Sequence, residues 1–453
     1  MSAEETTNNP GEVIKDDIKI TTMYGRTEDI TNYVLEVHLF EDIFAPYLSG
    51  EIVIDDAADI IQKFPIVGNE KVTLKFRTPT LDDDPINIIS KTFFVYGIKE
   101  RILNNDRGQT YKLKFTSYEH IVNNATTISA SFDDQTNEIV KKIFIDNIET
   151  ERFEDQSVTT PCLIGDTPHK TRVQYVSNGW TPFNNMAYLS RKSDGSRHTG
   201  SDFLFYESNK QFYFVSVQHL LFEQKEALFE EYLYTVPGME IEGRGGGETF
   251  IGHPLPHKWQ KISQISIPST IDIVRSQNNG HLANVTRGYD IVTKEYREAY
   301  IDTIEDFDKF VTTDEGVPLP AGTKRNAFNM TTAKILNSAN YDNYSMNIEN
   351  SLFNEGTRRS YLQGLMQTKF EITVPGRTDI EIGKMIKLVY PSASEKLTDA
   401  TYDDLIDPIL SGGYLITAIR HKITRTNPTD SFEHVMKMEI VKNGLGKSLG
   451  SEE

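Results

Sequence analysis

The sequence predicts a mainly β protein with an α/β domain, in which two similar antiparallel β-barrel domains flank the smaller α/β domain. The chain has 24 Phe and 21 Tyr but only 2 Trp, and aromatic side chains suit half-buried sheet faces. Short alternating runs recur in two separate regions, and helical spacing appears mainly between them. At roughly 150 residues per domain, a chain of 453 residues is long enough for about three domains.

The predicted domain boundaries follow these changes of pattern. We expect a disordered arm at residues 1–15, a first β-barrel domain at 16–120, an α/β domain at 121–225, a second β-barrel domain at 226–305 and 366–445, an insertion at 306–365 and a flexible tail at 446–453.

The first β region contains short strands separated by turn residues. The predicted strands are residues 33–40, 50–55, 71–76, 92–98 and 111–115. Residues 104–108 read Asn-Asn-Asp-Arg-Gly, which is typical of a turn. Several short strands over about ninety residues favour a small barrel or sandwich.

The middle region changes to helical periodicity. Ile139, Val140, Ile143 and Phe144 predict a helix between residues 134 and 148, with Asp134 or Thr136 as its N-cap. A second helix is expected to start at Thr181-Pro182, because proline is favoured at the first helical position, and Gly195 lies beyond its end. The runs 203–207 and 212–215 flank a polar turn and predict a hairpin.

Strand patterns return in the last part of the chain. The predicted strands are residues 262–274, 282–291, 370–374, 385–390, 414–423 and 434–441. Residues 241–258 are rich in Gly and Pro and predict a loop. The insertion is rich in Asp, Asn and Thr, and is expected to end in a short helix that bears Tyr361, Leu362, Leu365 and Met366.

The two β regions resemble each other. Gly68 precedes the strand 72–76 as Gly383 precedes 385–390, residues 95–99 correspond to 416–420, and 111–115 correspond to 436–440. Two unrelated β domains could also give this pattern, and the sequence leaves that alternative open. If the repeat is real, three copies could form a ring of six barrels. Such a ring would match a threefold partner on one face and a sixfold partner on the other, and it needs no catalytic residue.

The charge balance argues against nucleic-acid binding. Lys and Arg number 47 against 66 Asp and Glu, a formal net charge of −19. Such a chain gains no affinity by releasing phosphate counterions, and it would be repelled by an anionic bilayer. Residues 1–17 lack the pattern of a signal peptide, and no run of 18 apolar residues predicts a membrane span. A single cysteine, Cys162, excludes an internal disulfide and is expected to be a small buried hydrophobe.

The chemical motifs are weak, and the sequence names no catalytic, cofactor-binding or metal-ligating residue. The glycine-rich residues 243–249 lack the Gly-Lys-Ser/Thr ending of a phosphate loop, and the prolines around His253 and His257 prevent a helical metal pair. The acidic residues 55–56 and 82–84 lack a calcium-loop pattern and are expected in solvated loops. Phe203–Phe205 and Phe212–Phe214 are expected in a core rather than on a stacking platform. With 66 acids, a carboxylate pair for glycoside hydrolysis stays open.

Two stretches of the chain resemble a known family. Residues 182–191 read Pro-Phe-x-x-Met-Ala-x-Leu-Ser-Arg and are followed by Gly195 and the two aromatic strands. Near the C-terminus, a helix over 358–367 precedes Ile382-Gly383 and the run 412–421, Gly-Gly-Tyr-Leu-Ile-Thr-Ala-Ile-Arg-His. These patterns resemble the baseplate hub of T4-like contractile-tailed phages, which is related to the hub part of type VI secretion spike proteins. The resemblance extends over residues 30–445.

The resemblance implies a non-enzymatic protein that forms a homotrimeric, pseudo-sixfold ring in the virion, assembled in the host cytoplasm. Such a hub binds the central spike on one face and the tail tube initiator or tube protein on the other, and baseplate wedge proteins surround it. Its lumen passes the tape measure protein and then DNA, and a negatively charged channel would not trap DNA in transit. Residues 1–453 show no pattern of a β-helix or needle, so we expect the spike to be a separate chain.

Three other functions stay open at this stage. A carbohydrate-binding tail protein would use exposed tyrosines to bind glycans. A cell-wall hydrolase would use a carboxylate pair. The hub role could also belong to a headless injection system or a type VI secretion system rather than to a phage.

Overall fold

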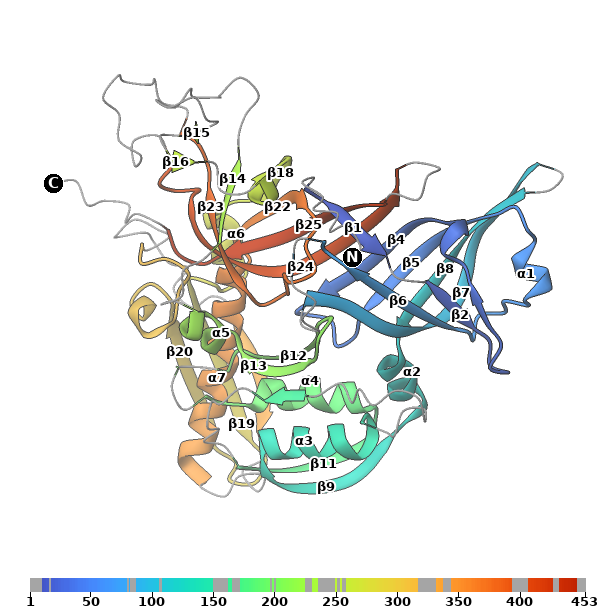
Figure 1. The fold of residues 1–453 in the computed structure, drawn as a ribbon. Helices are drawn as coiled ribbons and strands as arrows, with labels where there is room; N and C mark the ends of the chain where they lie inside the picture. The colour runs from blue at the N-terminus through green and yellow to red at the C-terminus, as the bar shows by residue number, and fades with distance from the viewer. Residues whose placement is uncertain are drawn as a thin grey trace.

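The computed structural model shows a mostly β protein in which one large mixed sheet lies above a smaller α/β layer (Figure 1). The structure describes residues 10–445, apart from 16–17, 80, 82–86, 106–107, 150–161, 165–171, 196–197, 199–200, 225–229, 235–248, 251–252, 255–257, 317–330, 337–343, 393–405 and 427–431. The predicted flexible tail 446–453 and most of the loop 241–258 lie outside the described residues.

A first module of five antiparallel strands follows the predicted pattern. Its strands are β4 (Val34–Asp42), β5 (Ser49–Asp56), β6 (Lys71–Arg77), β7 (Ile88–Asn105) and β8 (Gly108–Ser117). They are ordered β4–β5–β8–β7–β6 in the sheet. Alternate residues such as Ile52, Leu74 and Leu113 point into one core and are fully buried, as expected for strands with one buried face.

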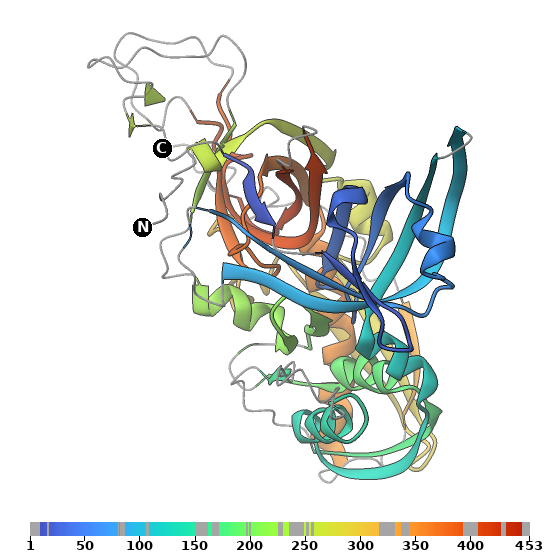
Figure 2. The same ribbon diagram turned by 45° about the vertical axis from the view of Figure 1, so that its right-hand side comes forward.

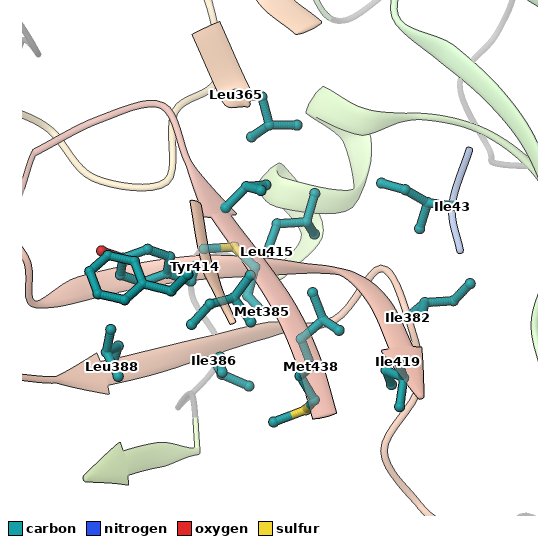
Figure 3. Close-up of a cluster of buried hydrophobic side chains, with 14 of the residues drawn as sticks. Ile43, Leu365, Ile382, Met385, Ile386, Leu388, Tyr414, Leu415, Ile419 and Met438 are labelled. Carbon is teal, nitrogen blue, oxygen red and sulfur yellow. The ribbon is translucent and has the colours of Figure 1, made fainter. Parts of the chain in front are cut away.

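A second module repeats this strand order. It consists of β18 (Gln264–Ser269), β22 (Thr368–Pro375), β23 (Met385–Val389), β24 (Gly412–Arg425) and β25 (Phe432–Lys442), ordered β18–β22–β25–β24–β23. Its core surrounds β23 and β24, and Leu365 and Ile43 contribute to it from outside the module (Figure 3).

The pairing registers of the two modules agree with the residues that the sequence aligns. Ile98 lies opposite Leu113 in the first module, and Ile419 lies opposite Met438 in the second. The register shifts by one residue after Val95 and, at the aligned position, after Ile416. Gly68 and Gly383 both adopt positive φ, of 98° and 81°, which glycine tolerates best. Matching bulges and turns support a duplicated unit more strongly than matching apolar residues do.

The two modules share strands, so their pairings form one continuous sheet. The second half of β24 pairs with β4, and β25 pairs with β1 (Glu12–Lys15), which in turn pairs with β6. The pairings therefore form a closed circuit, β4–β5–β8–β7–β6–β1–β25–β24–β4. The predicted disordered arm 1–15 is thus wrong for residues 12–15. Val13 and Ile14 form too short an apolar run to show a strand pattern, but Val13 packs in the core of the first module.

The second module is completed by parallel strands, which corrects the prediction of purely antiparallel barrels. β14 (Glu231–Tyr234) pairs in parallel with both β23 and β17 (Lys261–Ile262). β18 follows β17 directly in the sequence. The chain therefore leaves its place beside β14 and continues beside β22. The predicted long strand 262–274 is therefore divided, and it ends in the helix α6 (Ile273–Asn278).

The α/β layer matches the predicted helices and hairpin. It contains α2 (Tyr118–Ala125), β9 (Ile128–Gln135), α3 (Thr136–Asn147), β10 (Cys162–Ile164), β11 (Arg172–Trp180), α4 (Pro182–Lys192), β12 (Phe203–Glu207), β13 (Phe212–Ser216) and α5 (Val217–Gln224). Pro182 opens α4 as predicted. The predicted N-cap of α3 is wrong, because Gln135 occupies that position without a side-chain cap, and the Thr136 hydroxyl instead accepts a hydrogen bond from Ser193.

Residues 283–302 do not belong to the second module, which corrects the predicted domain boundary. β19 (Ala283–Asp290) pairs with β20 (Tyr296–Asp302) and, in parallel, with β21 (Thr331–Leu336), forming a separate sheet. The helix α7 (Tyr344–Leu365) lies on this sheet and is longer than predicted. A Cβ on Gly356 would lie 2.6 Å from Ile301 Cγ1, so glycine allows the helix to approach the sheet closely.

The remaining elements are short. They are β2 (Lys19–Thr21), β3 (Thr27–Asp29), η1 (Thr31–Tyr33), α1 (Ile60–Lys63), β15 (Thr249–Phe250), β16 (His253–Pro254), η3 (Lys258–Gln260) and η4 (Phe307–Lys309). No helix within the described ranges is long and apolar enough to cross a membrane.

The two faces of β1 give a matched pair of variants. Val13 is 7% exposed and Ile14 is 38% exposed. We expect Val13→Asp to lower the free energy of unfolding by about 2–4 kcal/mol, because it buries a charge without a partner, whereas Ile14→Asp should lower it by less than about 1 kcal/mol. Urea unfolding of both variants would measure this, and equal losses would contradict the strand assignment.

Candidate functional site: the junction between the modules

The tip of the β12–β13 hairpin lies between the two modules. Buried Glu207 accepts a hydrogen bond from the Leu48 backbone at 3.0 Å and forms an ion pair with Lys91, both in the first module. Ser208 donates to Glu381 of the second module at 2.5 Å, and Tyr213 donates to the same carboxylate at 2.7 Å. The α/β layer is therefore bonded to both modules through one turn.

A chain of buried polar groups crosses the junction. His434 Nε2 lies 3.1 Å from His421 Nδ1, and His421 Nε2 lies 3.0 Å from Glu41 Oε1. The Asn209 backbone donates to the other Glu41 oxygen at 3.1 Å. Among the residues that the structure describes, Nδ1 of His434 has no hydrogen-bond partner. The arrangement that satisfies the remaining groups has His434 Nε2–H donating to His421, and His421 Nε2–H donating to Glu41.

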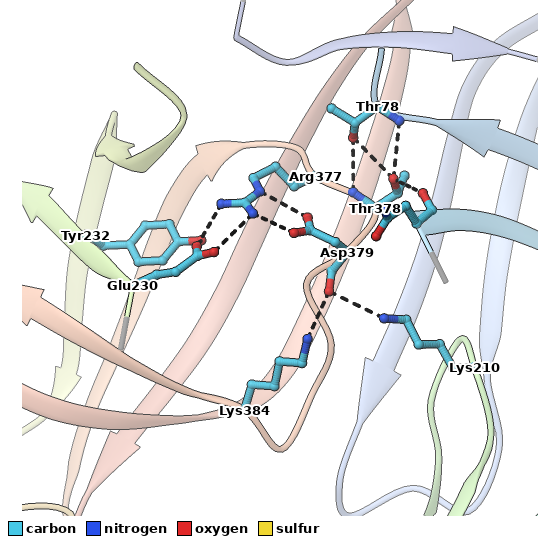
Figure 4. Close-up of polar contacts among 9 residues, drawn as sticks. Thr78, Lys210, Glu230, Tyr232, Arg377, Thr378, Asp379 and Lys384 are labelled. Atoms are coloured by element: carbon cyan, nitrogen blue, oxygen red, sulfur yellow. Dashed lines mark hydrogen bonds and ion pairs between the residues drawn. The ribbon is translucent and has the colours of Figure 1, made fainter. Parts of the chain in front are cut away.

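A second polar cluster holds the loop between β22 and β23 (Figure 4). Arg377 donates two hydrogen bonds to Glu230, at 2.7 and 3.0 Å, and two to Asp379, at 2.5 and 3.0 Å. Next to it, Thr378 and Thr78 exchange backbone-to-hydroxyl hydrogen bonds of 3.1 and 3.2 Å across the junction. Bidentate arginine contacts fix geometry as well as adding energy, so Arg377 holds the loop to Glu230, while the threonine pair holds it against the first module.

Burial shifts the pKa of groups in the junction. Desolvation raises the pKa of Glu207 to about 7, and repulsion from Glu119 adds to the effect, while Lys91 opposes it. Desolvation, followed by the neighbouring His421, holds the pKa of His434 well below its usual range. Burial alone would lower the pKa of Arg377, but its contacts with Asp379 and Glu230 outweigh this and raise it.

The junction is suited to holding segments in place rather than to chemistry on a substrate. The hydrogen bonds and ion pairs described above join separate parts of the chain, and His421 and His434 are fully buried. Within the described residues, no group of three or more His, Cys, Asp or Glu could hold a metal ion. The cavity beside α7, lined by residues that include His281 and Tyr361, measures about 30 Å³, which is room for about one or two water molecules.

The structure decides some of the sequence-based expectations for single residues. Phe203–Phe205 and Phe212–Phe214 lie in a core, as predicted. The expectation for Asp56 is wrong, because it is 1% exposed and accepts hydrogen bonds from the backbone of Ile60 and Ile61. The acidic cluster 82–84 and His257 lie outside the described residues, as do the side chains of Cys162 and His253.

The residues of the junction were not predicted from the sequence. Glu41 follows the apolar β4 run, and His421 sits in the apolar run of β24. A single polar residue at an inward position of an alternating strand was the available signal, because such a residue must find a buried partner. The partner itself lies far along the chain, so the sequence alone does not name it.

Comparisons with known proteins show the fold but no family. No family model matches the chain, and no curated protein does. The chain is similar to the tail protein from Neisseria meningitidis MC58, with a TM-score of 0.53 and 8% identity over 95% of this chain and 97% of that one. It also matches the 43 kDa tail protein of prophage MuSo2 from Shewanella oneidensis, at a TM-score of 0.47 and 9% identity over 94% of this chain and 98% of that one.

A third match is the E. coli c3393 protein, a type VI secretion component described as structurally similar to the T4 tail proteins gp27 and gp5. Its TM-score is 0.40 at 10% identity, over 95% of this chain and 76% of that one. The Neisseria likeness carries the conclusion: this chain shares its fold with that tail protein.

The close contact of Gly376 with His434 gives a test of the junction. A Cβ on Gly376 would lie 2.1 Å from His434 Cγ, whereas one on Gly97 would meet nothing within 4 Å. We expect Gly376→Ala to lower the free energy of unfolding by about 3 kcal/mol or more through overpacking, and Gly97→Ala to change it by less than about 1 kcal/mol. Chemical denaturation of the two variants would compare them, and a harmless Gly376→Ala would refute this packing.

The buried His434 predicts a pH dependence of stability. Its folded pKa is depressed, so the unfolded chain takes up a proton near pH 6.5 that the folded chain does not. The associated stability is present above about pH 6.5 and is lost as the pH falls below it. Between pH 7.5 and 5, wild type should therefore lose about 2 kcal/mol more than His434→Gln, as measured by urea unfolding at each pH. Parallel pH profiles would contradict the prediction.

Proposed function

We propose that this chain is the structural, non-enzymatic hub of a phage contractile-tail baseplate. Three copies form a ring that joins the threefold central spike to the sixfold tail tube and encloses the channel for the tape measure protein and DNA. Its partners are further copies of itself, the spike, the tube initiator or tube protein, the tape measure protein and the baseplate wedge proteins. It acts in the virion after assembly in the host cytoplasm, without specific binding to nucleic acid.

The duplicated module carries this proposal. Two five-stranded units with the same order, register and bulge are joined side by side in one chain. A protein with two equivalent units per copy presents six equivalent units as a trimer, and such a trimer can bind both threefold and sixfold partners. The fold shared with the Neisseria tail protein supports the same setting, and the charge of −19 suits a channel that DNA must leave freely.

A glycan-binding tail protein is the second candidate, and one surface favours it. Tyr289, Tyr296 and Tyr300 on β19 and β20 are each about half exposed, and exposed aromatic rings are a common surface for sugars. A glycan array separates the candidates, because the hub requires no glycan signal. Capsid genes beside the gene for this chain would distinguish a phage hub from that of a headless injection system.

The hub proposal predicts the oligomeric state. Native mass measurement of the purified chain with its spike protein should give a complex that contains three copies of the 51.5 kDa chain, and electron microscopy should show a ring with pseudo-sixfold symmetry. A chain that stays monomeric beside its spike would overturn the proposal.

A further inference from the structure

The contact between the two modules within one chain provides a template for a contact between chains. Residues 418–424 of β24 pair antiparallel with residues 36–42 of β4. At the far end of this pairing Ile423 lies opposite Val37, and they are 4% and 1% exposed. Ile423 belongs to the core of the first module although it comes from the second. The second module therefore extends its long strand β24 along β4, the edge strand of the first module.

The first module has an equivalent long strand, β7. Strands β8 and β25 provide a common reference for comparing the modules, because Leu113 and Met438 occupy equivalent positions. Four residues before these lie Gln109, which is opposite Leu103, and His434, which is opposite Ile423. Leu103 therefore takes the place of Ile423. The irregular register between Lys99 and Ile102, where Glu100 adopts a φ of 51°, accounts for the extra residue in β7.

The second module has an equivalent receiving edge, β18. Val37 lies opposite Ile52 in the first module, and Ile265 lies opposite Ile372 in the second. Ile52 and Ile372 are themselves equivalent, since they face Leu113 and Met438. Ile265 therefore takes the place of Val37.

In the described part of the chain, residues 98–105 of β7 and strand β18 each have a strand neighbour on one side only. The pairings place β8 alone beside residues 98–105 of β7, and β22 alone beside β18. Ile102 and Leu103 are 61% and 77% exposed, and Ile267 is 38% exposed. The β7–β8 hairpin projects from the molecule on the side away from β18 (Figures 1 and 2). Long apolar strand edges of this kind are templates for pairing with another chain.

We propose that residues 98–104 of β7 pair antiparallel with β18 of a second copy of this chain, in the register that places Leu103 opposite Ile265. The contact is head-to-tail, because it joins two different edges, so it must close into a ring or continue as a filament. The closed form of three copies rests on the proposed hub function, whereas the pairing itself rests on the equivalence of the two modules.

The side chains at the two edges fit this occupant. In the template, Lys422 pairs with Glu36 at 3.2 Å and Arg420 lies over the ring of Phe40. At the proposed contact, Ile102 occupies the position of Lys422, and Lys99 occupies the position of Arg420. The receiving strand β18 carries Ile265 and Ile267. Ile102, Leu103 and Ile267 carry apolar area that the single chain leaves exposed, and burial of this area stabilises the pairing beside the charged Lys99, Glu100 and Arg101.

Cysteine pairs test the register directly. The native Cys162 is the only cysteine, so the background is Cys162→Ser. Leu103→Cys combined with Ile265→Cys should form a disulfide, because directly opposite residues in an antiparallel pair have Cα atoms about 4.5–5.5 Å apart. The control combines Leu103→Cys with Ser269→Cys, which lies four residues, or about 13 Å, along the strand. The readout is non-reducing gel electrophoresis of the oxidised hub with its spike protein.

The outcomes separate the pairing from the hub proposal. A covalent trimer from the first pair, and little product from the control, supports both. A ladder longer than three copies supports the pairing and overturns the closed ring. A trimer by native mass that gives no disulfide, or more disulfide in the control pair, overturns the pairing and leaves the hub proposal standing. A chain that stays monomeric beside its spike overturns the hub proposal, and the closed ring falls with it.

A charge substitution provides a second measurement that does not depend on oxidation. Leu103→Asp should leave the unfolding transition of the single chain unchanged, because the side chain is 77% exposed, but should reduce the trimer fraction at least tenfold. Val176→Asp, 70% exposed on a strand of another sheet, is the matched control and should keep the trimer. Trimer retained by Leu103→Asp would overturn the proposed contact.

Discussion

The shared strand β24 is the constraint on which the rest of the structure depends. Residues 412–415 of β24 pair with β23, residues 418–424 pair with β4, and β25 follows the strand along most of its length. Buried backbone donors and acceptors must be paired, so this ladder fixes the position of the first module relative to the second. Two domains joined only by a linker would move independently, whereas these two are held by a row of backbone hydrogen bonds. The proposed hub role would use this rigidity, because a hub must hold partners of different symmetry in fixed positions.

The polar groups of the junction define which arrangement of the modules is adopted. Buried charges contribute little net stability, because desolvation offsets their attraction to a partner, so the ion pair of Glu207 with Lys91 and the hydrogen bond of Glu41 with His421 are poor sources of folding energy. They are effective in another way, since any displaced arrangement would leave a buried carboxylate without its partner, which costs several kcal/mol. The turn between β12 and β13 brings groups to both modules at once. The α/β layer thus selects one relative orientation for the two sheets.

The sequence predicted the elements of the fold better than it predicted their partners. Alternation identified β5, β6, β8 and β22 because each has one fully buried face. It also identified β19 as a strand but placed it in the wrong sheet, since alternation does not encode the neighbouring strand. The short strand β1 was missed, because four residues in a polar region carry no period. Glu41 and Glu207 were missed for a related reason: a buried charge is recognised only through its partner, and Lys91 and His421 lie 116 and 380 residues away.

The two kinds of module contact differ in chemistry for a thermodynamic reason. Within one chain the modules are tethered, so their contact need not offset the loss of translational and rotational freedom. For separate molecules this loss costs roughly 4–15 kcal/mol. A polar junction that mainly selects geometry is sufficient there. A contact between copies must also offset this cost of association, and burial of exposed apolar area is the strongest general source of favourable free energy. The replacement of Lys422 on β24 by the exposed Ile102 on β7, next to Leu103, follows this rule. In the proposed ring, the duplicated unit would therefore have a polar edge inside the chain that selects geometry and a more apolar edge between copies.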